Sequence, residues 1–150
     1  MLADSQLLPE CIYRPGSFSG LMLLYESNYL RLAALTGDLD GDTDRWISRV
    51  RRDSELYLIR TKQERYTTTL CMTYWLRAKD GTVFKDPDMT VRIYHDAGLV
   101  EAIACQSTHR HQHLREISNT HAGELNRRWD INMMLNKWLE YLLDNGHGFA

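Results

Sequence analysis

The segment MTVRIYHDAG at 89–98 places a guanidinium, a phenol, an imidazole and a carboxylate within five consecutive residues. Apolar and polar side chains alternate along it, which is typical of a β-strand with one buried face. The alternation predicts that Arg92, Tyr94 and Asp96 share one face, while His95 follows the apolar residues on the other. The polar face could hold an anionic ligand or a peptide through charged and directional hydrogen bonds. Equally, these side chains could only form cross-strand pairs.

The threonines of the neighbouring segment YTTTLCMTYWL would lie beside this polar face. His95 has two interpretations. It could be a partly buried imidazole at the strand end that bonds a backbone carbonyl or a carboxylate, or it could be oriented by Asp96 within a binding site. The predicted ligand-binding set contains residues from both segments: Arg65, Thr67, Arg92, Tyr94, His95 and Asp96.

The run HRHQH offers a different chemistry, because His109, His111 and His113 alternate and would project to one side of an extended strand. Three such residues span about 13 Å at about 3.3 Å per residue, so one zinc ion could accept only two of them. The alternative hypothesis is therefore a metal-assisted hydrolase in which His95 or Asp96 acts as the base. The chain contains no HExxH motif, and solvated loop histidines are the competing interpretation. We expect no cofactor.

Two charged runs and the cysteines give weaker signals. The segment DLDGDTD at 38–44 offers alternating carboxylates, but the twelfth position is Arg49 rather than the glutamate that closes a calcium loop. The arginines of RWISRVRR at 45–52 could contact RNA, although a formal net charge of −2 argues against a general affinity for nucleic acid. The cysteines are odd in number and form no CxxC pair, which predicts packing rather than disulfides or zinc for Cys11, Cys71 and Cys105.

The spacing of hydrophobic residues predicts the helices and strands that carry these candidate site residues. Residues 1–16 are expected to form an irregular arm and 17–147 a single domain. Helical spacing predicts a helix over 17–37, capped by Ser17 or Ser19 and stopped by Gly37, and a second helix from Asp130 to Asn145-Gly146. The apolar stripe of that second helix contains methionine and tryptophan, which we interpret as core.

Between the helices the period changes to two, which predicts four strands. The segment at 45–52 is expected to be a short helix and 107–128 a loop. Turns are predicted at 79–81 and 86–88, and Ala97-Gly98 suits a tight hairpin because glycine accepts positive φ. The predicted fold class is α+β: an N-terminal helix, a four-stranded mainly antiparallel sheet, and a C-terminal helix packed on one sheet face. The predicted strands are 54–63, 66–76, 89–96 and 99–106.

No apolar run approaches the roughly 18–20 residues needed to span a bilayer, and the N-terminus has no signal-peptide pattern. We therefore expect a cytoplasmic protein without membrane contact. Its partner would be another protein or a small anionic ligand. The second sheet face could be open or covered by a second copy of the chain in a homodimer. The leading hypothesis is a non-catalytic binding module.

Four segments, in order, resemble the YqiB-like family, a group of small proteobacterial proteins of unknown function: LMLLYESNYLRL, ERYTT, DMTVRIYHDAGLVEA and WDINMMLNKWLEYLLDNGH. The resemblance runs from about residue 20 to 147. It implies a cytosolic bacterial protein with a real strand at 89–96, and it implies no reaction. Glu26 and Asn28 match the first helix of the family, and Asp130 and Asn136 match positions heading its last helix. The start of that last helix departs from the family pattern at Ile131 and Asn132, and the alternating histidines are no part of the pattern.

Overall fold

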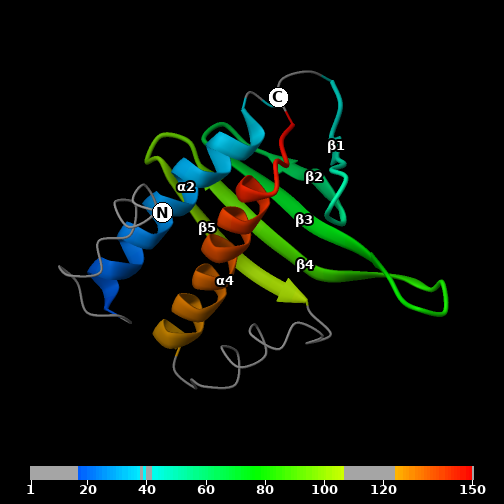
Figure 1. Cartoon of the computed structure of the whole chain (residues 1–150). Coiled ribbons are helices and arrows are strands. Elements are labelled where there is room, and N and C mark those ends of the chain that lie inside the picture. Colours follow the sequence, from blue (N-terminus) through cyan, green and yellow to red (C-terminus); the bar gives the residue numbers. More distant parts are fainter. Residues whose placement is uncertain (1–16, 38, 40–41, 107–123, 150) are drawn as a thin grey trace.

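The computed structural model describes residues 17–37, 39, 42–106 and 124–149. Five antiparallel strands form one sheet in the order β1-β2-β3-β4-β5, and both helices lie across the same face of it (Figure 1). The predicted α+β class is confirmed, with one strand more than expected. The elements are α2 (Phe18–Thr36), β1 (Arg45–Ser48), β2 (Glu55–Gln63), β3 (Thr67–Arg77), β4 (Val83–Tyr94), β5 (Leu99–Gln106) and α4 (Glu124–Asp144).

Helix α2 begins and ends where its sequence signals predict. The Ser17 hydroxyl accepts a hydrogen bond from the Gly20 N–H at 3.1 Å, which satisfies one of the free amides of the first turn. Gly37 stops the helix with φ 58°, and its N–H bonds the Ala33 carbonyl at 2.9 Å. The buried stripe of α2 includes Leu21, Leu24 and Leu32, as its spacing predicts.

Helix α4 begins at Glu124, so the predicted start at Asp130 was too late and the predicted loop is wrong for 124–128. The first turns carry no apolar stripe that a periodicity argument could detect. They are held instead by charge: Glu124 forms ion pairs with Arg127 at 3.3 Å and with Arg128 at 3.0 Å, at the i+3 and i+4 spacings that meet on a helix.

Strand β1 replaces the short helix predicted for 45–52. Its residues pair antiparallel with β2, so that Trp46 lies opposite Leu58 and Ser48 opposite Leu56. At four residues the strand is too short for a period of two to be recognised, and its pairing with β2 decides its conformation. Because the segment is not a helix, its arginines do not form the helical basic side considered for RNA.

The predicted turn at 86–88 is also wrong, because these residues belong to the interior of β4. The register between β3 and β4 shifts between Thr73 and Trp75, opposite this part of the strand. Such an irregularity is where a sheet can accept Pro87, which has no N–H to donate. Asp86 and Pro87 are both buried here.

The core lies between the helices and the inner face of the sheet. It contains the predicted stripe of α4, Met134, Leu135, Trp138, Leu139 and Leu142, together with alternate residues of the strands, including Leu56, Leu58, Leu70, Met72, Met89, Val91 and Val100. Neither of the two described helices combines the length and the apolar character that crossing a membrane requires.

Candidate functional site

The structure confirms the alternation on which the polar-face prediction depends. In β4, Met89, Val91 and Ile93 are buried in the core, while Arg92 and Tyr94 are half-buried on the opposite face. Both helices cover the face of the sheet that packs into the core (Figure 1). Arg92 and Tyr94 therefore lie on the opposite face, which no described helix covers. We call this the open sheet face.

The open sheet face brings several of the predicted residues together. Thr67 pairs with Tyr94, and Thr69, the next threonine on the same face, pairs with Arg92 across the β3–β4 ladder. The Tyr94 hydroxyl donates to Glu101 at 2.7 Å, so part of the polar face is engaged in cross-strand bonding. Burial and this hydrogen bond raise the pKa of Tyr94, which keeps the phenol protonated.

Two predicted residues lie in turns rather than on this face. Arg65 is exposed between β2 and β3, with its guanidinium 5.2 Å from the centre of the Tyr66 ring. Asp96 is exposed in the turn between β4 and β5. Gly98, in the same turn, has φ 67°, as the predicted hairpin requires. The predicted set is therefore spread along one end of the sheet.

His95 is directed to the other side of the sheet. Its Nε2 lies 2.6 Å from the Thr68 hydroxyl, and its backbone N–H bonds the Tyr66 carbonyl at 2.9 Å. The expected partner was a backbone carbonyl or a carboxylate, and the expected burial was partial. The structure instead gives a hydroxyl partner and an exposed imidazole.

This imidazole lines a cleft of about 710 Å³ between the C-terminal half of α2 and the inner face of the sheet. The floor is apolar. The rim carries groups that can form hydrogen bonds or bear charge, contributed by separate elements. We call this the ligand cleft. Its lining residues on α2 and the following loop are Tyr29, Leu32, Ala33, Thr36, Gly37, Leu39 and Asp44, and on the sheet Arg60, Gln63, Thr68, Ile93, His95 and Val100.

Arg60 is the charged group that β2 contributes to the ligand cleft. Its Nε donates to the Asp44 carboxylate at 2.9 Å, and a terminal nitrogen donates to the Thr43 carbonyl at 3.1 Å. Its guanidinium lies 5.4 Å from the centre of the Trp46 ring, a distance suited to a cation–π contact. This arginine was not among the predicted site residues, because its charge falls in an ordinary strand-forming segment.

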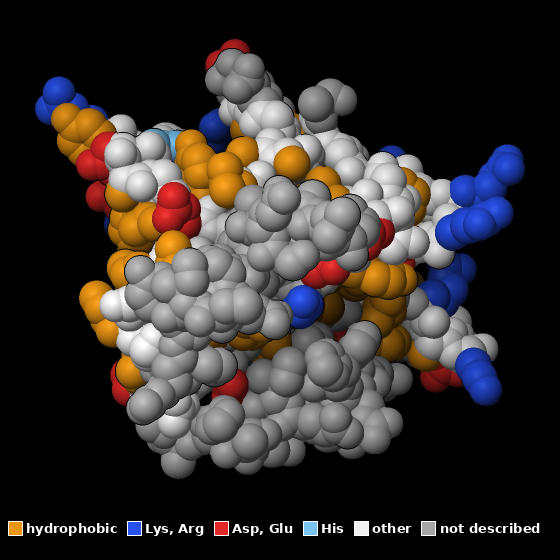
Figure 2. Space-filling model, turned by 60° about the vertical axis from the view of Figure 1, so that its left-hand side comes forward, with side chains coloured by type: hydrophobic (Ala, Val, Ile, Leu, Met, Phe, Trp, Pro, Cys, Tyr) orange, Lys and Arg blue, Asp and Glu red, His pale blue; other side chains and the backbone are white. Residues whose placement is uncertain are grey.

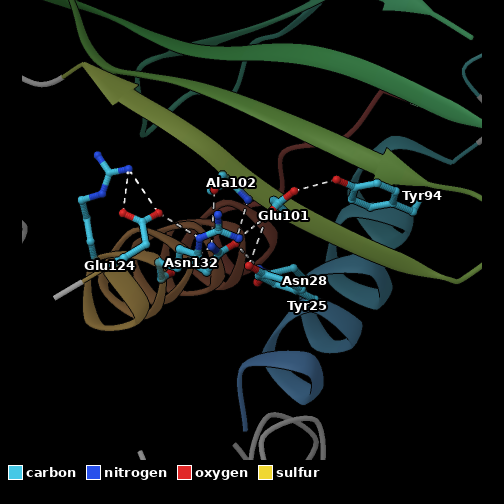
Figure 3. A network of polar contacts seen from close by, with 9 residues as sticks. Tyr25, Asn28, Tyr94, Glu101, Ala102, Glu124 and Asn132 are labelled. Atoms are coloured by element: carbon cyan, nitrogen blue, oxygen red, sulfur yellow. Dashed lines mark hydrogen bonds and ion pairs between the residues drawn. The ribbon is translucent and has the colours of Figure 1, made fainter. Parts of the chain in front are cut away.

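A second polar group surrounds Glu101 at the β5 edge of the sheet (Figure 3). Its carboxylate accepts from Tyr94 at 2.7 Å and from Tyr25 of α2 at 3.2 Å, with Arg128 of α4 at 3.9 Å. Burial and the neighbouring carboxylate raise the pKa of Tyr25 to about 12. A phenol with a raised pKa stays protonated at neutral pH and remains a hydrogen-bond donor, so this group is suited to joining the helices to the sheet.

Asparagines form the polar contact between the helices. The Asn132 amide accepts from the Ala102 N–H at 2.7 Å, and its nitrogen donates to the Ala102 carbonyl at 3.4 Å (Figure 3). Asn28 donates to Asn132 at 3.3 Å, and Asn136 donates to Asn28 at 3.0 Å. All three asparagines are fully buried. Asn132 and Asn28 thereby bond backbone groups of Ala102 and Val100 on the outer edge of β5, which would otherwise be unpaired.

A buried histidine was missed by the sequence analysis. His147 follows α4, and its Nδ1 lies 2.9 Å from the Ser48 hydroxyl while its Nε2 lies 2.8 Å from the Asp53 carboxylate. Asp53 also accepts from Tyr74 at 2.5 Å. We call these four residues the C-terminal clasp.

The C-terminal clasp has the residue types of a hydrolytic triad but lacks its accessibility. The His147 side chain has no exposed area, and the Ser48 hydroxyl accepts the Gly148 N–H at 3.1 Å. Neither residue lines the ligand cleft. A nucleophile must reach its substrate, so the arrangement is suited to fastening residues 147–149 against the sheet.

The metal hypothesis falls on residues that the structure does not describe, since His109, His111 and His113 lie in the segment 107–123. Within the described residues no group of three or more histidine, cysteine, aspartate or glutamate side chains is placed to hold a metal ion. Of the cysteines, Cys11 also lies outside the described part. Burial raises the pKa of the Cys105 thiol to about 11, which fits the packing role predicted for it.

Exposed apolar side chains are a weaker indication of a site than the ligand cleft. On the side shown in Figure 2, hydrophobic side chains reach the surface at several places among acidic and basic ones. Over all the described residues, on every side of the molecule, the large exposed hydrophobic side chains come from both helices, several strands and a turn. They are Phe18, Leu30, Ile47, Tyr66, Val83, Ile103, Leu125 and Tyr141. Such scattered exposure is ordinary for globular proteins.

Comparison with known proteins places this chain among relatives that carry no assigned activity. It is 30% identical over 136 residues to the Escherichia coli K12 protein named "Uncharacterized protein YqiB", which covers 89% of this chain and 93% of the relative. The proteins of the same name from E. coli O157:H7 and O6:H1 match equally. No solved structure shows a significant match. The family model "Protein of unknown function (DUF1249)" matches residues 31–148, and the chain belongs to that family.

Proposed function

We propose that this chain is a non-catalytic binding module that holds a small ligand in the ligand cleft. The observation that carries the proposal is the cleft itself, about 710 Å³ with an apolar floor and a polar rim. Small-molecule sites in proteins are usually about 300–1,000 Å³ and combine these two kinds of lining. The ligand therefore has an apolar body, which rests on the sheet, and a polar group at the rim.

Two contacts support a site organised for binding. The Thr68 hydroxyl orients the His95 imidazole at 2.6 Å, and Asp44 orients the Arg60 guanidinium at 2.9 Å. Side chains held in this way lose less conformational freedom when a ligand binds, which favours affinity. The pairing of the His147 imidazole with the Asp53 carboxylate is buried in the C-terminal clasp and contributes nothing to the cleft lining. Because the histidine–carboxylate pair lies outside the cleft, the residues that line the cleft are better suited to recognising a ligand than to catalysis.

The experiment uses two neighbouring alanines of α2. Ala33 lines the ligand cleft, whereas Ala34 does not, and both are exposed. Ala33→Trp should fill the cleft with an indole and leave the core untouched, and Ala34→Trp is the matched control. A thermal-shift screen of metabolite-like compounds should find ligands that raise the melting temperature of the wild type and of Ala34→Trp. The same ligands should lose their effect on Ala33→Trp. Ligands that stabilise both variants equally would place the binding site elsewhere.

A second candidate is the open sheet face, which would hold a partner protein or a small anionic ligand through Arg92. The supporting observation is that a half-buried guanidinium lies on a face without a covering helix, and that the same face carries an aromatic pair farther along the sheet. Tyr57 and Trp75 meet edge-on with ring centres 6.0 Å apart, and Lys85 lies 5.2 Å from the Trp75 ring. Arginine and aromatic side chains are enriched in the most important contacts of protein interfaces.

Backbone amide shifts distinguish the two candidates. A ligand of the cleft should shift the amides around Thr68 and His95, whereas a partner on the open sheet face should shift those around Arg92 and Trp75. Arg92→Gln should weaken only the second kind of binding. A copy of the chain as partner would appear as a dimer in light scattering, and the same substitution should reduce its stability. If Arg92→Gln changes none of these measurements, the second candidate fails.

A further inference from the structure

The electrostatic surroundings of the ligand cleft determine what charge its ligand can carry. The C-terminal end of α2 lines it through Thr36 and Gly37. The last carbonyls of a helix carry a partial negative charge, equivalent to roughly half an electron charge for a regular helix. Basic side chains often compensate that charge, but the last turn of α2 contains none. This end of the cleft therefore favours a positive group.

The chain that follows α2 is acidic. Residues 37–44 read GDLDGDTD, with four aspartates and no lysine or arginine. Of these aspartates the structure describes Asp42 and Asp44, both exposed, and Asp44 lines the cleft. Exposed carboxylates are ionised at neutral pH and attract cations over short distances, although salt screens the attraction. The end of α2 and this loop therefore both carry negative charge and both favour a positively charged ligand.

The positive charge that faces the helix end and the acidic loop is that of Arg60, and it is already paired with a carboxylate. Among the described lining residues, leaving the histidine aside, Arg60 carries the single full positive charge. It is paired with Asp44 at 2.9 Å, donates to the Thr43 carbonyl, and lies against the Trp46 ring. His95 is held by a hydroxyl, which adds no charge of either sign. Once these pairs are formed, the negative partial charge of the α2 end remains at the cleft, and the exposed Asp42 adds the same sign from the following loop without lining the cleft.

We infer that the ligand of the cleft is an organic cation, an amine or guanidinium carried on an apolar body. This inference rests on the function proposed for the ligand cleft and specifies its ligand. The apolar body packs against Leu32, Ile93 and Val100 of the floor. The cationic group lies toward the end of α2 and Asp44. The anionic ligand expected from the sequence remains a hypothesis for the open sheet face only.

Three probes that share one apolar body test the sign of the charge. Tryptamine, tryptophol and indole-3-acetate carry an ammonium, a hydroxyl and a carboxylate on the same indole. Titrations followed by amide shifts at low ionic strength should give the tightest binding for tryptamine. A preference of roughly fivefold over tryptophol is expected from one helix end and one carboxylate near the surface. Indole-3-acetate should bind most weakly.

Charge variants and the blocked cleft separate the possible outcomes. Asp44→Asn leaves the positive charge of Arg60 without its carboxylate partner at the rim and should therefore remove most of the preference for tryptamine. Asp80→Asn removes the same charge from the turn before β4 and should leave the preference unchanged. If indole-3-acetate binds tightest and Ala33→Trp abolishes that binding, the cleft is a ligand site but the inferred cation is wrong. If no probe binds in a way that Ala33→Trp abolishes, the inference and the proposed function both fail.

Discussion

Replacing Asn132 with alanine should remove the side chain that closes the outer edge of the sheet. In the folded protein this amide accepts from the Ala102 N–H at 2.7 Å and from Asn28 at 3.3 Å. It donates to the Arg128 carbonyl at 2.9 Å and to the Ala102 carbonyl at 3.4 Å. All of these groups lie where two helices cover β5, so water cannot readily replace the lost amide.

The loss in the free energy of unfolding can be worked out from the hydrogen-bond donors that lose their acceptor in Asn132→Ala. A buried donor left unsatisfied costs about 1–3 kcal/mol. We assign about 2 kcal/mol to the Ala102 N–H, whose bond is short, and about 1 kcal/mol to Asn28, which keeps its bond to the Val100 carbonyl. Asn132→Ala should therefore lower the free energy of unfolding by about 3 kcal/mol, a large part of the 5–15 kcal/mol typical of a domain.

Urea unfolding followed by circular dichroism measures this loss, with Asn126→Ala as the control. Asn126 is exposed on the same helix, and its replacement should change the free energy of unfolding by less than about 0.5 kcal/mol. Hydrogen exchange adds a local readout, because the Ala102 amide should exchange faster in Asn132→Ala than global unfolding explains. A loss below about 1 kcal/mol with an equally protected Ala102 amide would refute the assigned role of Asn132.

Three further outcomes are expected. The pKa of Tyr25, raised to about 12, means that its contribution to stability is complete below the ordinary tyrosine value near 10 and is lost as pH rises toward 12. Burial and neighbouring carboxylates also raise the pKa values of Tyr74 and Tyr94, so difference absorbance at 295 nm should show several late-titrating phenols, of which Tyr25→Phe removes one. Gly98→Ala should cost about 1–2 kcal/mol in thermal unfolding because φ there is 67°, whereas Gly148→Ala, whose new methyl meets only ordinary contacts, should be nearly neutral. Tyr74→Phe removes the hydroxyl that donates to the Asp53 carboxylate at 2.5 Å and should cost about 1.5–3 kcal/mol in urea unfolding; an unchanged midpoint would contradict the C-terminal clasp.

Periodicity over long segments carried most of the fold prediction. The twelve residues of β4 contain enough alternation to assign both faces of its second half, and the glycines at 37 and 98 fix the ends of elements through positive φ. The failures came from short or charged segments. Strand β1 has four residues and depends on its partner, and the start of α4 is stabilised by ion pairs rather than by an apolar stripe.

The ligand cleft could be predicted only in part. His95 was recognised because it interrupts an apolar series at a strand end, but its partner Thr68 and the nearby Arg60 belong to other strands. Their approach depends on strand register, which a single sequence does not reveal. The C-terminal clasp joins Ser48 to His147, which are 99 residues apart, and neither has a neighbour that marks it as functional. Both sites are therefore properties of the tertiary structure.

The pairing of α2 with α4 has a consequence for how the protein is made. Helix α2 is synthesised early, yet Asn28 meets Asn136 and Arg31 meets Glu140 across more than 100 intervening residues. Residue 149 completes the arrangement, since its N–H bonds the Leu35 carbonyl at 3.1 Å. Translation proceeds from the N-terminus, so the apolar side of α2 remains without its partner helix while the sheet strands are being synthesised. On the ribosome, a chaperone therefore has a long time to act on the segment 18–36.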